Sequence, residues 1–261
     1  MKRFVEELRP RQIMDVCDRT ALVFIPVSPL IEWHSFQLPL GTDGLIAEGV
    51  AAALAEEFDG LCCRCLPIAL DENRDAKSKE QWGLPSAADV FGMNFPVLPL
   101  TSEYHTPELM RGMLEARLVA LKASGFRTAF LVNHHGGAGQ NDTLAKIAAE
   151  SSDDTFVVSV LAVPSFNAFH EEGERSLHLK VGGHAGLSET MQLMAFRPDL
   201  VDLNELPEGE LFVAETGILH HEPVVPAEFN PRHATQDLAD RWRESTLKNA
   251  AKRVREIMAL D

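Results

Sequence analysis

The sequence has few basic residues and no long apolar run. Lys and Arg number 24 against 39 Asp and Glu, so the 261 residues carry a formal charge of -15. Because contacts to phosphates need clustered Lys and Arg, this balance argues against a nucleic acid partner. No segment reaches the roughly 18 apolar residues of a membrane helix, and the N-terminal stretch lacks the apolar core of a signal peptide. We therefore expect a cytoplasmic protein with no membrane partner.

Cysteine is also scarce, with four residues in the chain. Cys62 and Cys65 form a C-x-x-C pair, but no second pair and no nearby histidine completes a zinc tetrad. The apolar segment 61–70 instead predicts a buried strand in a reducing compartment, where free cysteine behaves as a small apolar residue.

Two groups of enzymes are disfavoured by motifs that the sequence lacks. Neither G-x-x-x-x-G-K nor a strand-linked G-x-G-x-x-G is present, so a nucleotide cofactor is not expected. The G-x-S-x-G elbow of serine hydrolases is missing as well, which disfavours a serine triad.

What the sequence contains is an alternation of strand and helix patterns. Compact apolar runs predict strands at 20–27, 61–70, 127–132 and 155–163. Helical periodicity predicts helices at 45–58, 107–124, 140–151, 187–196 and 235–258. Residues 71–105 are mostly irregular and too long for a plain connector, which is typical of a functional loop. The alternation predicts a mainly parallel sheet covered by helices on both faces, with residues 1–261 as one domain.

Three polar clusters lie where predicted strands end or a helix begins. In chain order they are Glu32 with His34 and Asp43, His134 with His135, and His184 with Glu189. In open parallel sheets ligands bind beyond the carboxyl ends of the strands, so we expect the three clusters to lie at the same edge of the sheet. In an extended chain, the E-x-H spacing also turns both side chains to the same side. A mixed carboxylate and imidazole set suits Zn, Mn or Fe(II) better than Ca or Mg.

Each cluster alone is a weak signal, but together they resemble the creatininase (creatinine amidohydrolase) family. The segments that carry the resemblance are EWHSFQLPLGTD, NHHGGA and HAGLSET, with a fainter likeness at NPRHAT, so that it spans about residues 20–235. The resemblance implies a three-layer α/β/α fold, a homohexamer and a site for two divalent metal ions. The small-molecule substrate would be hydrolysed there.

The resemblance also implies a role for each ligand. Asp43 would bridge both ions, and Glu32 and His135 would complete the shell of one ion. His34 would belong to the other ion, to which Glu189 would supply a further carboxylate.

His184 matches the family histidine that moves protons near the substrate, so His184 and Glu189 are the predicted catalytic residues. The expected reaction is hydrolysis of a C–N bond in a small cyclic amide, amide or formamide by water that the metal ions activate. Two alternatives stay open. One is hydrolytic C–C ring opening of a cyclic diketone derived from an inositol or sugar, and the other is a noncatalytic binding protein.

The sequence departs from the family pattern in the second cluster. His134 and Ala138 replace the glycine and the final asparagine of N-G-H-G-G-N. We prefer His135 as the ligand because it keeps the register to Gly136 and Gly137. Family members that hydrolyse creatinine carry a glutamate where this chain has Gly137, so creatinine is not the expected substrate.

Overall fold

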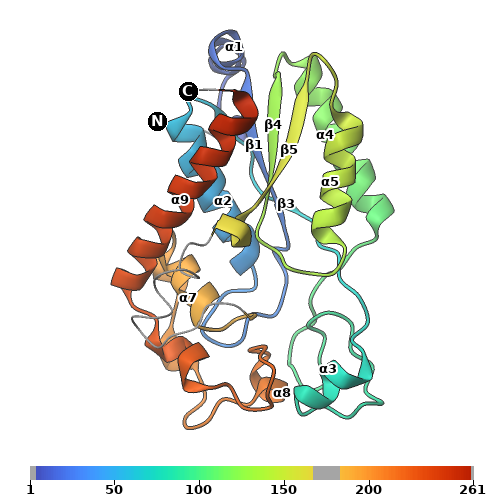
Figure 1. Ribbon diagram of the computed structural model, residues 1–261, viewed down its shortest axis with the longest axis vertical. Helices are drawn as coiled ribbons and strands as arrows, with labels where there is room; N and C mark the ends of the chain where they lie inside the picture. The colour runs from blue at the N-terminus through green and yellow to red at the C-terminus, as the bar shows by residue number, and fades with distance from the viewer. Residues whose placement is uncertain (1–3, 167–182, 260–261) are drawn as a thin grey trace.

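The computed structural model describes residues 4–166 and 183–259, and a parallel sheet runs through its centre (Figure 1). β1 pairs with β4, β4 pairs with β5, and the two short strands β2 and β3 pair with successive parts of β1. Their bounds are Leu22–Ser28 for β1, Leu61–Cys62 for β2, Leu66–Pro67 for β3, Thr128–Asn133 for β4 and Val157–Ala162 for β5. Every one of these pairings is parallel, which confirms the predicted sheet.

Helices cover both faces of this sheet, as Figure 1 shows. One face carries α2 (Thr42–Glu57) and α9 (Gln236–Met258), with α7 (Leu187–Met194) packed against both, and the other carries α4 (Pro107–Ala123) and α5 (Gln140–Ser151). The three-layer prediction is therefore confirmed. α2 begins three residues before the predicted helix, which places Asp43 in its first turn.

β1 shows why the sheet is buried on both sides. Leu22 and Phe24 belong to the apolar cluster formed with α2 and α9, whereas Val23, Ile25 and Val27 belong to the cluster formed with α4. Because side chains alternate along a strand, a strand covered on both faces needs a continuous apolar run. The predicted strand at 20–27 has that run.

The single strand predicted at 61–70 is wrong, because the chain leaves the sheet between β2 and β3. The Arg64 guanidinium turns outward and forms ion pairs with Glu7 and Glu48. The backbone N–H of Cys65 donates to the Glu48 carboxylate at 3.0 Å instead of to β1. All four cysteines are free thiols, and Cys62, Cys63 and Cys65 are buried, as expected.

Several short elements were not predicted. The remaining helices of the described residues are α1 (Pro10–Arg19), α3 (Ala76–Gln81) and α8 (Val213–Thr216). In the same part of the chain, 3-10 turns are formed by Val5–Glu7, Val163–Phe166, Pro198–Leu200, Leu203–Glu205, Ala227–Phe229 and Pro231–His233. The otherwise irregular segments 71–105 and 203–229 share a third apolar cluster, which includes Trp33, Met93 and Ile218. Among the described residues, no helix combines the length and apolarity needed to cross a bilayer.

Candidate metal centre

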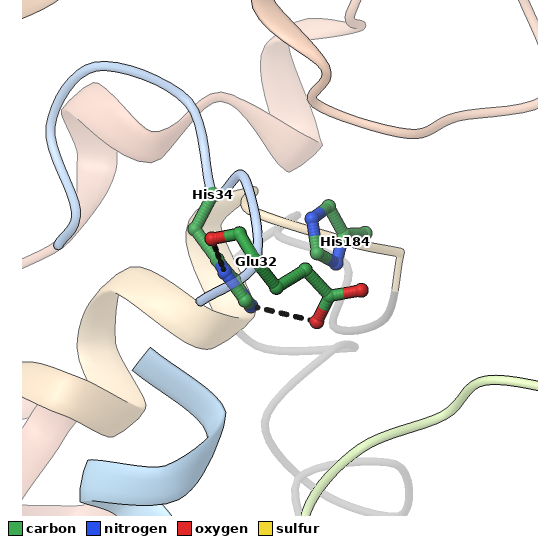
Figure 2. A group of neighbouring side chains, drawn as sticks. All are labelled: Glu32, His34 and His184. Atoms are coloured by element: carbon green, nitrogen blue, oxygen red, sulfur yellow. Dashed lines mark hydrogen bonds and ion pairs between the residues drawn. The ribbon is translucent and has the colours of Figure 1, made fainter. Parts of the chain in front are cut away.

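The loop between β1 and α2 places Glu32 and His34 beside each other, as the E-x-H spacing predicted. His34 Nδ1 donates to the Glu32 backbone carbonyl at 3.0 Å, so its Nε2 is the nitrogen that faces the carboxylates. Nε2 lies 3.8 Å from Glu32 Oε2. Figure 2 shows these two side chains and His184 turned toward one another.

Asp43 is the central carboxylate of the cluster and is buried in the first turn of α2. Its Oδ1 lies 2.6 Å from His134 Nδ1 and 3.6 Å from His34 Nε2. Its Oδ2 lies 2.9 Å from His135 Nδ1. Three imidazoles from two different loops therefore meet at one carboxylate.

The end of β4 is held by a small polar network that aims the two histidines. The backbone N–H of His134 donates to Ser28 Oγ at 3.0 Å, and that hydroxyl donates to Asn133 Oδ1 at 3.2 Å. The Asn133 side-chain amide donates to the His135 carbonyl at 2.8 Å. Ser28 is the last residue of β1, so this network ties the ends of neighbouring strands together.

One ring nitrogen of His135 is hydrogen-bonded to the backbone, and the other faces the carboxylates. Its Nε2 donates to the Leu70 carbonyl at 3.0 Å, and its Nδ1 faces Asp43 and lies 3.2 Å from Glu32 Oε2. A Cβ at position 137 would come within 2.2 Å of both His135 Nε2 and the Leu70 carbonyl oxygen. Gly137 is therefore required for this arrangement of His135.

His184 and Glu189 approach from the start of α7. Glu189 Oε2 accepts a hydrogen bond from the Ala185 N–H at 2.6 Å and lies 3.8 Å from His34 Nε2. His184 Nε2 donates to the Trp33 carbonyl at 2.6 Å, which leaves Nδ1 3.8 Å from Glu189 Oε2. The rings of His184 and His34 lie 4.3 Å apart.

The structure thus brings all six predicted site residues into one cluster. Within the described residues, three groups place their ligand atoms within 4.8 Å of one another: Glu32, Asp43 and His135; His34, Asp43 and Glu189; and Glu32, His34 and His184. The first two match the ligand sets that the family resemblance implied, and both contain Asp43. Their role as metal ligands stays a prediction.

The carboxylates and imidazoles of the centre shift one another's pKa values. Burial alone would lower the pKa of His34, but the carboxylates of Asp43, Glu189 and Glu32 raise it to about 9. Burial likewise opposes ionisation of Asp43 and Glu32, yet nearby histidines hold the pKa of Asp43 well below its usual value and lower that of Glu32. Glu32 and Asp43 also raise the pKa of His135 far above its ordinary value, against the effect of burial. These buried carboxylates therefore require positive charge beside them.

The donor set fits divalent cations. His34 Nε2 is fully buried, faces three carboxylates and makes no hydrogen bond within the described part of the chain. A buried polar atom without a partner is costly, and a cation at this position would satisfy it. The nitrogen and oxygen ligands are of the kinds that Zn, Mn and Fe(II) accept.

Two further residues support this cluster: Tyr104, which sequence reasoning missed, and His134, which it named beside His135 without assigning it a role. Tyr104 donates from its hydroxyl to Glu32 Oε1 at 2.7 Å, and burial together with Glu32 raises the pKa of the phenol. His134 donates from Nδ1 to Asp43 and from Nε2 to the side-chain oxygen of Gln192, and it belongs to none of the three groups. Tyr104 lies within the long loop whose length indicated function.

A cavity of about 240 Å³ opens onto the cluster. Its polar wall includes Asp71 and Arg74, neither of which the sequence singled out. Gly136, Gly137 and Gly183 contribute backbone to the rest of the wall. The cavity is below the usual size of drug-sized ligand pockets, which begin at about 300 Å³, so it suits a small ligand.

Comparisons with known proteins show the family and the fold of this chain. A family model described as creatininase, creatinine amidohydrolase, matches residues 6–254. A search of curated proteins found no match. Among solved structures, one described as creatininase Mn is 20% identical over 98% of each chain, with a TM-score of 0.68. A creatinine amidohydrolase is 19% identical over 98% of this chain and 97% of its own, with a TM-score of 0.68.

A putative creatinine amidohydrolase from Bacteroides fragilis NCTC 9343 is 18% identical over 100% of this chain and 98% of its own, with a TM-score of 0.68. At such identities the structural likeness shows the fold, whereas the family model covers nearly the whole sequence. The chain therefore belongs to the creatininase family.

Proposed function

We propose that this protein is a two-metal hydrolase that cleaves the C–N bond of a small cyclic amide, amide or formamide. The observation that carries the proposal is the pair of ligand groups that share Asp43. Glu32 and His135 would hold one ion with Asp43, and His34 and Glu189 would hold the other. Solved creatininase structures include a manganese form and a Zn-Zn form, and the donor set here suits either metal as well as Fe(II).

In this proposal, residues of the chain orient the reacting groups and transfer protons. Two divalent ions, when bound, would lower the pKa of water and polarise a carbonyl group. His184 lies on the cavity wall, and its hydrogen bond to the Trp33 carbonyl sets the orientation of the ring. Its Nδ1 faces the cluster and can take a proton from water and return it to the departing nitrogen. Glu189, held by the Ala185 N–H, keeps its carboxylate near His184 Nδ1.

Metal content tests the centre directly. Chelator-treated protein titrated with Mn²⁺ or Zn²⁺ should bind two equivalents, and Asp43→Ala should lose both because Asp43 belongs to both groups. Asp142→Ala is the matched control, because Asp142 lies in the first turn of α5 and is exposed. A wild-type protein that takes up less than about half an equivalent would contradict the proposal, since these ligand sets should bind transition metals well.

A substrate panel tests the reaction. The metal-loaded protein should hydrolyse lactams, linear amides or formamides, and cyclic polyol diketones should be left unchanged. Turnover of a diketone without turnover of any C–N substrate would replace the proposed reaction by C–C ring opening. We also propose the homohexamer that the family resemblance implies, and sedimentation velocity would test it.

A further inference from the structure

One guanidinium group lines the same cavity as the metal ligands. Arg74 is the one Lys or Arg among the described residues of the cavity wall, and its side chain is 20% exposed. It lies in the long 71–105 loop, three residues after Asp71, which also contributes to the wall. A permanent positive charge beside a catalytic cavity calls for an explanation.

The protein holds Arg74 by one edge and leaves the other edge open. Nη2 donates to Asp71 Oδ2 at 2.6 Å, and Nε donates to the Gly92 carbonyl at 3.2 Å. The guanidinium carbon lies 5.9 Å from the centre of the Trp82 ring, which limits tilting of the plane. Nη1 makes no hydrogen bond with residues 4–166 or 183–259. The guanidinium group is therefore fixed in position, and its Nη1 donors are free to bind a ligand.

The charges of the cavity also favour an anion once metal is bound. The carboxylates on its wall are those of Glu32, Asp43, Asp71 and Glu189. Two divalent cations would offset all four, and Arg74 would then leave the cavity with a net positive charge. A planar guanidinium group with free donors binds a carboxylate by paired, charge-assisted hydrogen bonds.

We infer that the substrate carries a carboxylate, which binds Arg74 while the amide carbonyl lies at the metal centre. This inference rests on the proposed function. Asp71 and Gly92 set the direction of the guanidinium group, and the cavity of about 240 Å³ has room for a small amide that carries a carboxylate. Neutral amides of the same size would bind more weakly because they leave the open edge of Arg74 without a partner.

Calorimetric titration with hydroxamic acids tests the inference without depending on turnover. Hydroxamates bind metal ions, so acetohydroxamate probes the metal centre alone. The monohydroxamates of malonic, succinic and glutaric acid carry a carboxylate at three different distances from the hydroxamate group. With Mn²⁺-loaded wild-type protein, at least one of these three should bind about tenfold more tightly than acetohydroxamate, the gain expected of one charge-assisted contact. Arg74→Gln should remove that gain and leave acetohydroxamate binding unchanged.

Controls separate the possible failures. Arg111→Gln changes an arginine of α4 that pairs with Glu115 outside the cavity, and it should keep the full carboxylate preference. If Arg74→Gln does not fold, Arg74→Lys keeps the charge without the planar group and should reduce the preference. Equal binding of all four compounds to wild-type protein, or a preference that survives in a folded Arg74 variant, would overturn the inference. Failure of every hydroxamate to bind metal-loaded protein would instead remove the proposed function on which it rests.

Discussion

His134→Gly is the substitution that most directly probes how the bridging carboxylate is held. The family pattern has glycine at this position, so the change restores the residue that the pattern carries. In this chain the His134 ring lies between Asp43 and Gln192, with Nδ1 2.6 Å from Asp43 Oδ1. All three side chains are buried. Glycine would leave Asp43 Oδ1 without this donor.

The size of the effect follows from that contact. A hydrogen bond to a charged group contributes about 1.5–3 kcal/mol, which corresponds to roughly a 10- to 150-fold change in an equilibrium constant. Loss of a residue that orients a metal ligand lowers metal affinity by about 10- to 100-fold. Because Asp43 belongs to both ligand groups, we expect His134→Gly to weaken the binding of both ions.

Competition titration against a chelating dye with Mn²⁺ would measure the two affinities. His233→Gly is the matched control, because His233 is exposed and lies outside the metal centre, and it should bind metal as the wild type does. Circular dichroism of the metal-free variants would check that both fold. Unchanged affinity at both sites in a folded His134→Gly protein would show that Asp43 does not need His134.

Three further outcomes are expected. Tyr104→Phe removes the 2.7 Å hydrogen bond to Glu32 and should lower metal affinity by about tenfold, measured by the same titration, whereas unchanged affinity would show that Glu32 is held without it. His184→Ala should leave two ions bound, checked by elemental analysis, and slow turnover in a steady-state assay; loss of metal would make His184 a ligand instead. Burial raises the pKa of the Cys63 thiol to about 11, so at pH 8 only about one thiol in a thousand is ionised. Cys63 in folded protein should stay unmodified by a thiol reagent at pH 8 and react once denaturant is added, and rapid modification of the folded form would contradict its burial.

Sequence by itself determined the layer architecture and the chemical nature of the site. Apolar runs that alternate with helical periodicity specify strands buried on both faces, because this pattern is the one that lets β1 contribute Leu22 and Val23 to opposite cores. The E-x-H spacing placed Glu32 and His34 together because side-chain direction along an extended chain is a local property. The motifs that combine carboxylates and imidazoles indicated a metal centre, because the type of ligand is also read directly from the sequence.

Tertiary structure decided which residues complete that centre. Whether His134 or His135 joins Glu32 depends on where the end of β4 lies relative to the Leu70 carbonyl, and that position comes from strand order and from the Ser28 network. Tyr104 belongs to a loop without periodicity, so the length of the loop indicated function but nothing indicated which of its residues contacts the cluster. The break in the 61–70 strand likewise came from side-chain pairing with a distant helix. Local spacing sets the direction of a side chain, but only packing of distant segments sets its partner.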